Sequence, residues 1–229
     1  GTTKIICRNG KLHESYSLER CSVETAKSVI VNVYDDAKTM KVLLALSAYL
    51  KDKEFLFPDM RFVAAMENSQ YVEAANIASE GRAEIIYAKD AIARIISNTC
   101  RQHGLSQVLS EIFSFDGNEL YFEKISELTG KTFKEVVLSL ANAIAVGICK
   151  DGKVTLNPAM DTVIDADTEL VIIEADDGAY KINHDNVVDD TKICNDACVY
   201  AEASNNLVVL GTNDKLSIIL SEYDKYVEP

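Results

Sequence analysis

Short apolar runs alternate with amphipathic stretches through the first hundred residues of the chain. The runs have the length and β-branched content of buried strands, and the stretches between them repeat apolar residues with a helical period. Strands are predicted at residues 4–7, 28–33, 62–66 and 84–87, and helices at about 16–21, 37–51, 70–79 and 90–102. Strict alternation of strand and helix implies a parallel sheet with right-handed crossovers. The predicted fold class is therefore α/β, with a Rossmann-like parallel sheet.

This Rossmann-like sheet is predicted to be incomplete. A dinucleotide-binding domain opens with a strand, a glycine-rich loop, a helix and a second strand that ends in an acidic residue. None of these elements precedes the strand at residues 4–7, and Asn9-Gly10 offers a single glycine. A complete nucleotide site is therefore not expected in these residues.

The pattern changes after residue 115. Residues 145–149 and 154–156 flank the turn Asp151-Gly152-Lys153, which is typical of a β-hairpin. Further strands are predicted at residues 120–122 and 170–173, and a short helix at 133–140, so that residues 116–182 form a small α+β lobe. The division predicted from the sequence is a partial Rossmann-like lobe (1–115), this small lobe (116–182), a polar linker (183–205) and a second β-α beginning (206–229).

Charge and cysteine usage narrow the classes of function. The chain carries a formal net charge of −13 and shows no cluster of Lys and Arg, which argues against nucleic acid and against an anionic membrane surface as partners. No apolar run approaches the ~20 residues that span a bilayer. The six cysteines are scattered, mostly in apolar surroundings, as expected for reduced thiols in a cytoplasmic-type compartment.

Residues 206–211 resemble a strand that runs into Gly211-Thr212-Asn213-Asp214, followed by a helix over about 215–226. This is the context of a phosphate-binding loop, so Gly211, Asn213 and Asp214 are candidate cofactor-binding residues. The loop has one glycine where dinucleotide sites use three, and the Asp214 carboxylate would repel phosphate. Capping of the following helix is the role favoured for Asp214.

Metal and catalytic chemistry find little support. One candidate metal cluster consists of His184, Asp189, Asp190, Cys194, Asp196 and Cys198. Its Cys-x3-Cys spacing lacks the second pair of ligands that a zinc site would need. Calcium could use the carboxylates of Asp161, Asp165, Asp167, Glu169, Asp176 and Asp177, although no glycine-centred calcium loop lies among them. No Ser/His/Asp or Cys/His pair stands out as a nucleophile system, so the chain is not expected to be an enzyme.

Several motifs together resemble the RCK (regulator of K⁺ conductance) regions of the Castor/Pollux-type ion channels. Their order and spacing are more specific than any one motif. They are Cys7-Arg8-Asn9-Gly10, residues 88–94, residues 100–105, Gly130, Thr132-Phe133, residues 145–148, Leu156-Asn157-Pro158, residues 167–172 and residues 209–215.

This resemblance implies a function. Members of the family have a membrane pore followed by tandem RCK units, each a Rossmann lobe plus a TrkA-C-like lobe, in a tetrameric gating ring. The chain would begin at the third strand of one unit and end within the next, without the pore, at the cytoplasmic face of a membrane. It would form homo-oligomers, a dimer by itself and a tetramer in the full cation channel, for which potassium transport is one expected activity. An effector, with nucleotide and Ca²⁺ as open choices, would bind the small lobe near Ile148, Asn157 and Glu174.

Three questions stay open at this point. The alternatives to a gating module are an NAD(P)-binding oxidoreductase-like domain and a purely structural oligomerisation module. The helix after Asp90 carries Ile92, Ile95 and Ile96, which fit a core and a dimer interface equally well. The C-terminal segment 207–226 is expected to fill part of the vacant place beside the strand at residues 29–33, within the chain or in a partner.

Overall fold

The computed structural model describes residues 4–51, 53, 60–183 and 206–225. The chain divides into two compact units, which we describe separately. One contains residues Gly1–Arg101 together with Val209–Pro229, and the other contains Gln102–Val208. The division falls at Arg101, whereas the sequence analysis placed the end of the first lobe at residue 115.

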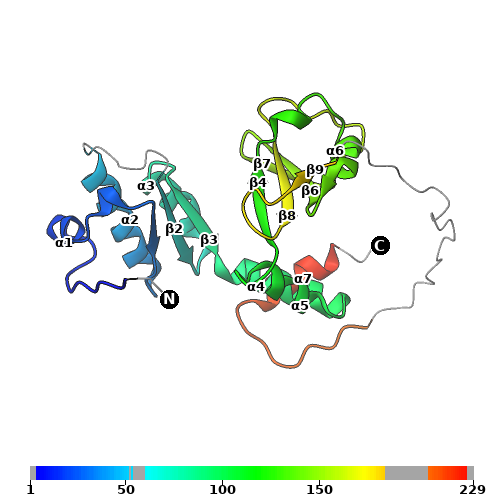
Figure 1. The fold of residues 1–229 in the computed structure, drawn as a ribbon. Coiled ribbons are helices and arrows are strands. Elements are labelled where there is room, and N and C mark those ends of the chain that lie inside the picture. Colours follow the sequence, from blue (N-terminus) through cyan, green and yellow to red (C-terminus); the bar gives the residue numbers. More distant parts are fainter. Residues whose placement is uncertain (1–3, 52, 54–59, 184–205, 226–229) are drawn as a thin grey trace, which may run out of the picture. The chain divides into compact units, whose positions relative to one another are not determined.

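The first unit is built on a three-stranded parallel sheet in the order β1-β2-β3 (Figure 1). Its strands are β1 (Ser28–Val31), β2 (Arg61–Met66) and β3 (Ala83–Tyr87). Its helices are α1 (Ser15–Arg20), α2 (Asp36–Leu50), α3 (Val72–Ala78), α4 (Ala88–Arg101) and α7 (Leu216–Asp224), with 3-10 turns η1 (Val23–Thr25) and η2 (Ser69–Tyr71). The predicted α/β class with a parallel sheet is confirmed.

The core of this unit follows the predicted periodicities. Alternate residues of β2 are buried, among them Phe62, and α2 buries Leu43, Leu46 and Leu50 on one side. Helix α2 begins where predicted because the Asp35 carboxylate accepts a hydrogen bond from the Lys38 backbone N–H at 2.8 Å. Patterning and capping together therefore place the first half of the sheet and its helices.

Two predicted strands are absent from the described residues. Residues 4–9 and 206–210 have neither helix nor strand geometry, and their apolar side chains are exposed, as Ile5 (83%) and Leu210 (92%) show. Both predictions were wrong for one reason: a strand persists only when its backbone groups pair with a neighbour, and neither segment pairs with another of the described residues' strands.

The C-terminal segment lies elsewhere than expected. Among the described strands β1 pairs with β2 alone, and α7 packs against α4 rather than along β1 (Figure 1). The prediction that this segment fills the place beside β1 is therefore wrong within this chain.

The second unit contains a four-stranded antiparallel sheet in the order β4-β8-β6-β7. Its main elements are α5 (Leu105–Ile112), β4 (Glu119–Glu123), α6 (Phe133–Ser139), β6 (Ile144–Lys150), β7 (Lys153–Leu156) and β8 (Glu169–Glu174). A 3-10 turn, η3 (Ser126–Leu128), and a small pair of strands, β5 (Leu140–Ala141) with β9 (Lys181–Ile182), complete it. The predicted small α+β lobe is confirmed, with β5 and β9 as additions.

Local signals explain how this lobe forms. Asp151 and Gly152 have φ of +52° and +73°, the left-handed geometry that the predicted hairpin turn requires. Helix α6 begins with a capping box in which Thr132 and Glu135 exchange hydrogen bonds at 2.7 and 3.3 Å. The helix thereby directs Phe133 into a core that also contains residues of β6 and β8.

Candidate functional site

Helices α4 and α7 form the most extensive helix pair among the described residues. The ammonium group of Lys89 lies 2.6 Å from a carboxylate oxygen of Asp214, and the guanidinium of Arg94 lies 3.0 Å from one of Glu222. The basic side chains of α4 are thus paired with acidic side chains of α7 and of the turn before it. Ion pairs of this partly exposed kind contribute only about 0.2–1 kcal/mol each to stability. They therefore set the orientation of α7 on α4 and contribute little to the free energy of the packed pair.

Small residues let these two helices approach closely. Ala93 is fully buried on α4, and Ser97, one turn later, is buried as well. The Ser97 hydroxyl lies 2.9 Å from the Ala93 carbonyl oxygen and 3.3 Å from the Ile219 carbonyl oxygen of α7. Contact between the helices therefore comes from the Ala93 and Ser97 side of α4, and Ile92 and Ile96 remain exposed.

The turn at Gly211 brings only part of the predicted nucleotide loop together. Gly211 has φ of +90°, and Asn213 accepts a hydrogen bond from the Lys215 backbone N–H at 2.9 Å. Both residues line an open hollow of about 270 Å³, to which Asp214 does not contribute. Hydrogen bonding from Lys89 lowers the pKa of Asp214 below its usual value.

The favoured capping role of Asp214 was wrong. Helix α7 has Lys215 at its N-cap and no side-chain capping bond. The Asp214 carboxylate is instead drawn to Lys89, a partner so distant in sequence that local spacing gave no sign of it.

The three predicted effector residues of the small lobe do not form one cluster around a free carboxylate. Ile148 lies on β6, and Asn157, with φ of +45°, follows β7 and donates its N–H to the Val146 carbonyl at 2.8 Å. Glu174 ends β8, where it pairs with Glu119 of β4. The first two residues therefore share the β6–β7 hairpin, and Glu174 lies apart.

Glu174 is fully buried and holds a turn of the backbone. Its carboxylate accepts hydrogen bonds from the N–H of Tyr180 at 2.6 Å and of Gly178 at 3.3 Å. Burial, followed by a hydrogen bond with Asp177, raises the pKa of the neighbouring Glu123. The Glu174 carboxylate is thus occupied by the lobe's own backbone.

No metal centre is found in the part of the chain that the structure describes, where no three His, Cys, Asp or Glu side chains gather suitably. The candidate cluster of His184, Asp189, Asp190, Cys194, Asp196 and Cys198 lies outside the described residues. Of the candidate calcium ligands, Asp165 is engaged by an ion pair with Lys150 and by the Thr168 hydroxyl at 2.6 Å. These hydrogen bonds lower the pKa of Asp165 to about 2.

We expect Lys150→Met to raise the pKa of Asp165 toward its ordinary value of 3.8. Because the folded-state pKa is depressed, this carboxylate stabilises the lobe above the unfolded value, and its contribution is lost as the pH falls toward 2. Carboxyl-carbon NMR titration measures the change directly. Lys153→Met, an exposed lysine in the same hairpin, is the control, and an equal shift in both variants would contradict the assignment to Lys150.

None of the helices in the described ranges has the length and apolar content needed to cross a membrane. Residues 89–191 match the protein family described as "Castor and Pollux, part of voltage-gated ion channel". This region of the chain is thus similar to the Castor and Pollux family. The match covers most of α4, all of the small lobe and the predicted linker up to residue 191.

Named relatives of this Castor and Pollux region are ion channels. The chain is 31% identical over 187 residues to "Probable ion channel POLLUX" of Arabidopsis thaliana, an alignment that covers 78% of this chain and 22% of the relative. It is 29% identical to "Ion channel CASTOR" of Lotus japonicus, over 78% of this chain and 21% of the relative. The chain thus spans about a fifth of the length of these relatives. Both relatives are named as ion channels, and neither name describes an oxidoreductase.

A solved structure supports the fold assignment. The chain is similar to "Structure of the human SLO3 gating ring", with a TM-score of 0.57 and 17% sequence identity over 74% of this chain and 36% of that chain. At this identity the similarity concerns the fold alone. The sequence resemblance predicted a Castor/Pollux-type region with the fold of a gating-ring unit. The family match and the fold similarity both agree with that prediction.

Proposed function

We propose that this chain is a cytosolic regulatory region of a Castor/Pollux-type cation channel, and that it controls conduction through assembly of RCK-like units. The support is the combination of a Castor and Pollux region with a gating-ring-like fold. In this proposal the chain dimerises by itself and forms a tetramer in the channel, at the cytoplasmic face of the membrane. An effector acts by binding one arrangement of the units more tightly than another.

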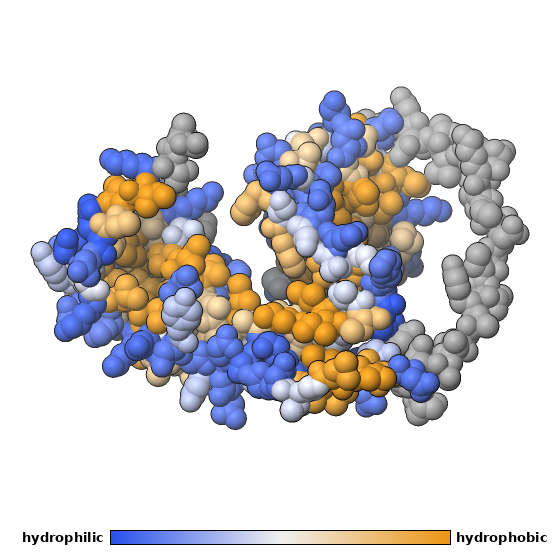
Figure 2. All heavy atoms as spheres, turned by 90° about the horizontal axis from the view of Figure 1, so that it is seen from below, coloured by the Kyte–Doolittle hydropathy of each residue, from blue (hydrophilic) through white to orange (hydrophobic). Residues whose placement is uncertain are grey.

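The observation that carries the proposal is the exposed apolar side of α4. Ile92 and Ile96 lie one helical turn apart and are 45% and 40% exposed, although α7 already covers the adjacent side of the helix. Hydrophobic side chains reach the surface of each unit (Figure 2). Ile92 and Ile96 differ from the others in lying on α4, the helix in which the residues that match the family begin. A second copy of α4 offers the same stripe, so that two copies can bury both by a two-fold contact.

The effector is proposed to bind the β6–β7 hairpin of the small lobe. Ile148 and Asn157 share this hairpin, and Glu174 would contribute through the turn it holds rather than through a free carboxylate. Nucleotide and Ca²⁺ are the ligands to screen first, by thermal shift of the chain.

We expect the double variant Ile92→Asp/Ile96→Asp to shift the chain from dimer to monomer in sedimentation equilibrium. Each copy would bring two carboxylates into the contact, and burying these charges away from water costs free energy of association. Ile77→Asp is the matched control, since Ile77 lies on α3 of the same unit and is 73% exposed. A wild-type chain that stays monomeric at all accessible concentrations, or equal dissociation in the control, would contradict assembly through α4.

The same variants separate regulation from scaffolding. In the full-length channel, recorded in planar bilayers, the double variant is expected to change the open probability while Ile77→Asp does not. Dissociation without any change in gating would favour the purely structural oligomerisation module.

A further inference from the structure

The N-terminal segment is tied to helix α1 at a point flanked by two cysteines. The Arg20 guanidinium donates a hydrogen bond to the Asn9 carbonyl oxygen at 3.4 Å. Cys21 follows Arg20 directly, and Cys7 lies two residues before Asn9. Both thiols are free, and both residues are exposed. One hydrogen bond therefore brings together two parts of the chain that each carry an accessible thiol.

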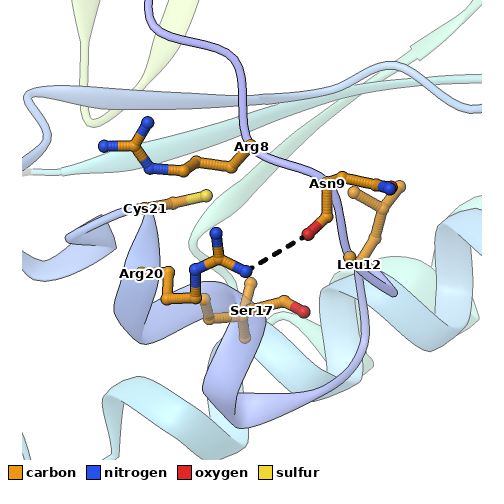
Figure 3. A pocket seen from close by; sticks show the side chains of 8 residues that line it. Arg8, Asn9, Leu12, Ser17, Arg20 and Cys21 are labelled. Atoms are coloured by element: carbon orange, nitrogen blue, oxygen red, sulfur yellow. Dashed lines mark hydrogen bonds between the residues drawn. The ribbon is translucent and has the colours of Figure 1, made fainter.

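A second contact links the backbone of Cys7 to the surroundings of Cys21. The Arg8 guanidinium donates to the Cys7 carbonyl oxygen at 3.3 Å. Arg8, Arg20 and Cys21 line one small hollow with a volume of about 60 Å³. In Figure 3 the side chain of Cys21 lies between those of Arg8 and Arg20. The arginine that contacts the Cys7 backbone therefore also borders Cys21.

The segment that carries Cys7 is held close to α1 at one residue, Gly10. A Cβ at Gly10 would lie 3.2 Å from the Ser17 Cβ and would clash with the Ser17 hydroxyl. Residues 4–9, in contrast, have neither helix nor strand geometry. The chain is thus fixed near Gly10, and no ladder of backbone hydrogen bonds has to break for Cys7 to approach Cys21.

The charges around Cys21 favour a negatively charged reactant. Neither Arg8 nor Arg20 forms an ion pair with any residue in the described ranges. The nearby Glu14 is paired with Lys11 at 2.9 Å. The chain as a whole carries a net charge of −13 and repels anions, so two unneutralised guanidinium groups form a local exception. Glutathione disulfide, a small disulfide with an excess of carboxylates, fits such a place.

We propose that Cys7 and Cys21 form a reversible disulfide, with glutathione disulfide as the oxidant. The Cys21 thiolate attacks one sulfur of glutathione disulfide, which forms a mixed disulfide and releases one glutathione thiolate. The Cys7 thiolate then attacks the Cys21 Sγ, and the second glutathione leaves. The two cysteines are oxidised to one disulfide and glutathione disulfide is reduced to two glutathione molecules, which take up the two protons of the cysteine thiols.

This disulfide replaces a single hydrogen bond with a covalent tie between the N-terminal segment and the end of α1. Helix α1 is anchored by Leu18 in the core of the parallel-sheet unit, so the tie fixes the segment to that core. Disulfides between exposed cysteines are usually the labile ones, which are reduced again when the glutathione pool recovers. The redox state thereby sets whether residues 4–9 are held on the unit, independently of assembly through α4.

Peptide mapping under non-reducing conditions tests the disulfide. The 229-residue chain is equilibrated in glutathione buffers with an increasing share of glutathione disulfide, trapped with N-ethylmaleimide and digested with trypsin. We expect a crosslink between the peptides 5–8 and 21–27, lighter than their sum by two hydrogen atoms and absent in excess reduced glutathione. Cys7→Ser and Cys21→Ser should each abolish it. Cys100→Ser removes another exposed thiol and should leave it unchanged.

The role of the arginines is measured on the first step alone. In the Cys7→Ser variant the mixed disulfide on Cys21 accumulates, and mass spectrometry gives its rate of formation. Arg8→Gln and Arg20→Gln should each slow the reaction with glutathione disulfide by about threefold, because each removes an attractive charge. Neither should slow the reaction with the uncharged bis(hydroxyethyl) disulfide. Arg61→Gln, an exposed arginine at the start of β2, changes the net charge equally and should leave both rates unchanged.

Several outcomes would overturn the inference. Circular dichroism spectra matching the wild type show that the variants remain folded, so that loss of the crosslink reflects loss of the thiol. A mixture of isotope-labelled and unlabelled chain shows whether the crosslink is internal. Crosslinks between copies, crosslinks that join only other cysteines, or no crosslink at any share of glutathione disulfide would each contradict an internal tie between Cys7 and Cys21.

Discussion

Replacing Phe133 with alanine is expected to destabilise the small lobe by about 3–5 kcal/mol and to leave the stability of the parallel-sheet unit unchanged. Phe133 is only 2% exposed and packs in one core cluster with Leu128, Val136 and Ile172. The parallel-sheet unit has a separate cluster around Phe62 and Leu43. A cavity at Phe133 therefore removes contacts from one core only.

Hydrogen exchange followed by mass spectrometry measures this difference, because it reports the opening free energy of each segment. Phe122→Ala is the matched control, since Phe122 lies in the same lobe on β4 and is 54% exposed. Phe62→Ala should produce the opposite result, with loss of protection in β2 and none in β8. Equal loss of protection in both units after either core substitution would contradict two independent cores.

The elements that sequence analysis predicted correctly are those whose cause is local. Asp35 caps α2 three residues ahead of its bonding partner, and the Asp151-Gly152 turn needs only its own backbone geometry. The alternation of β2 is visible because every second side chain enters the core. Apolar residues at 4–7 and 206–210 show the limit of such reasoning. Composition indicates that a segment can form a strand, but a strand requires a neighbour that composition does not reveal.

Features of the candidate sites were missed for the complementary reason, since their partners are distant along the chain. Lys89 and Asp214 are far apart in the sequence, and the sequence signal for the α4–α7 helix pair is limited to small residues at Ala93 and Ser97. Arg8 lies in the N-terminal segment and Arg20 ends α1, so no local motif joins them. Residue types predicted the class of each element, whereas tertiary contacts decided which side chains meet.

Glu174 is the residue whose predicted and observed roles differ most in physical terms. A glutamate at the end of a strand is usually solvated, and the sequence offered it as a ligand-binding group. In the structure it is fully buried with its carboxylate bonded to two backbone N–H groups, those of Tyr180 and Gly178. It therefore fixes the turn between β8 and β9.

We expect Glu174→Ala to destabilise the small lobe by about 2–6 kcal/mol, because two N–H groups lose their acceptor at about 1–3 kcal/mol each. Glu174→Gln should recover part of this loss, since its single carbonyl oxygen can accept from Tyr180 while its NH₂ group faces the N–H of Gly178. Urea unfolding gives the free energies, and hydrogen exchange at residues 178–182 shows whether the turn itself opens.

The control for this experiment is Asp176→Ala. Asp176 is exposed, and its carboxylate accepts only from the adjacent Asp177 N–H at 2.9 Å, so its removal should cost less than about 0.5 kcal/mol. A residue that served only to bind an effector would show the reverse pattern, with Glu174→Gln as stable as the wild type and defective in binding alone. Stability of Glu174→Ala within the range of the control would contradict the turn-holding role and return the carboxylate to the effector site.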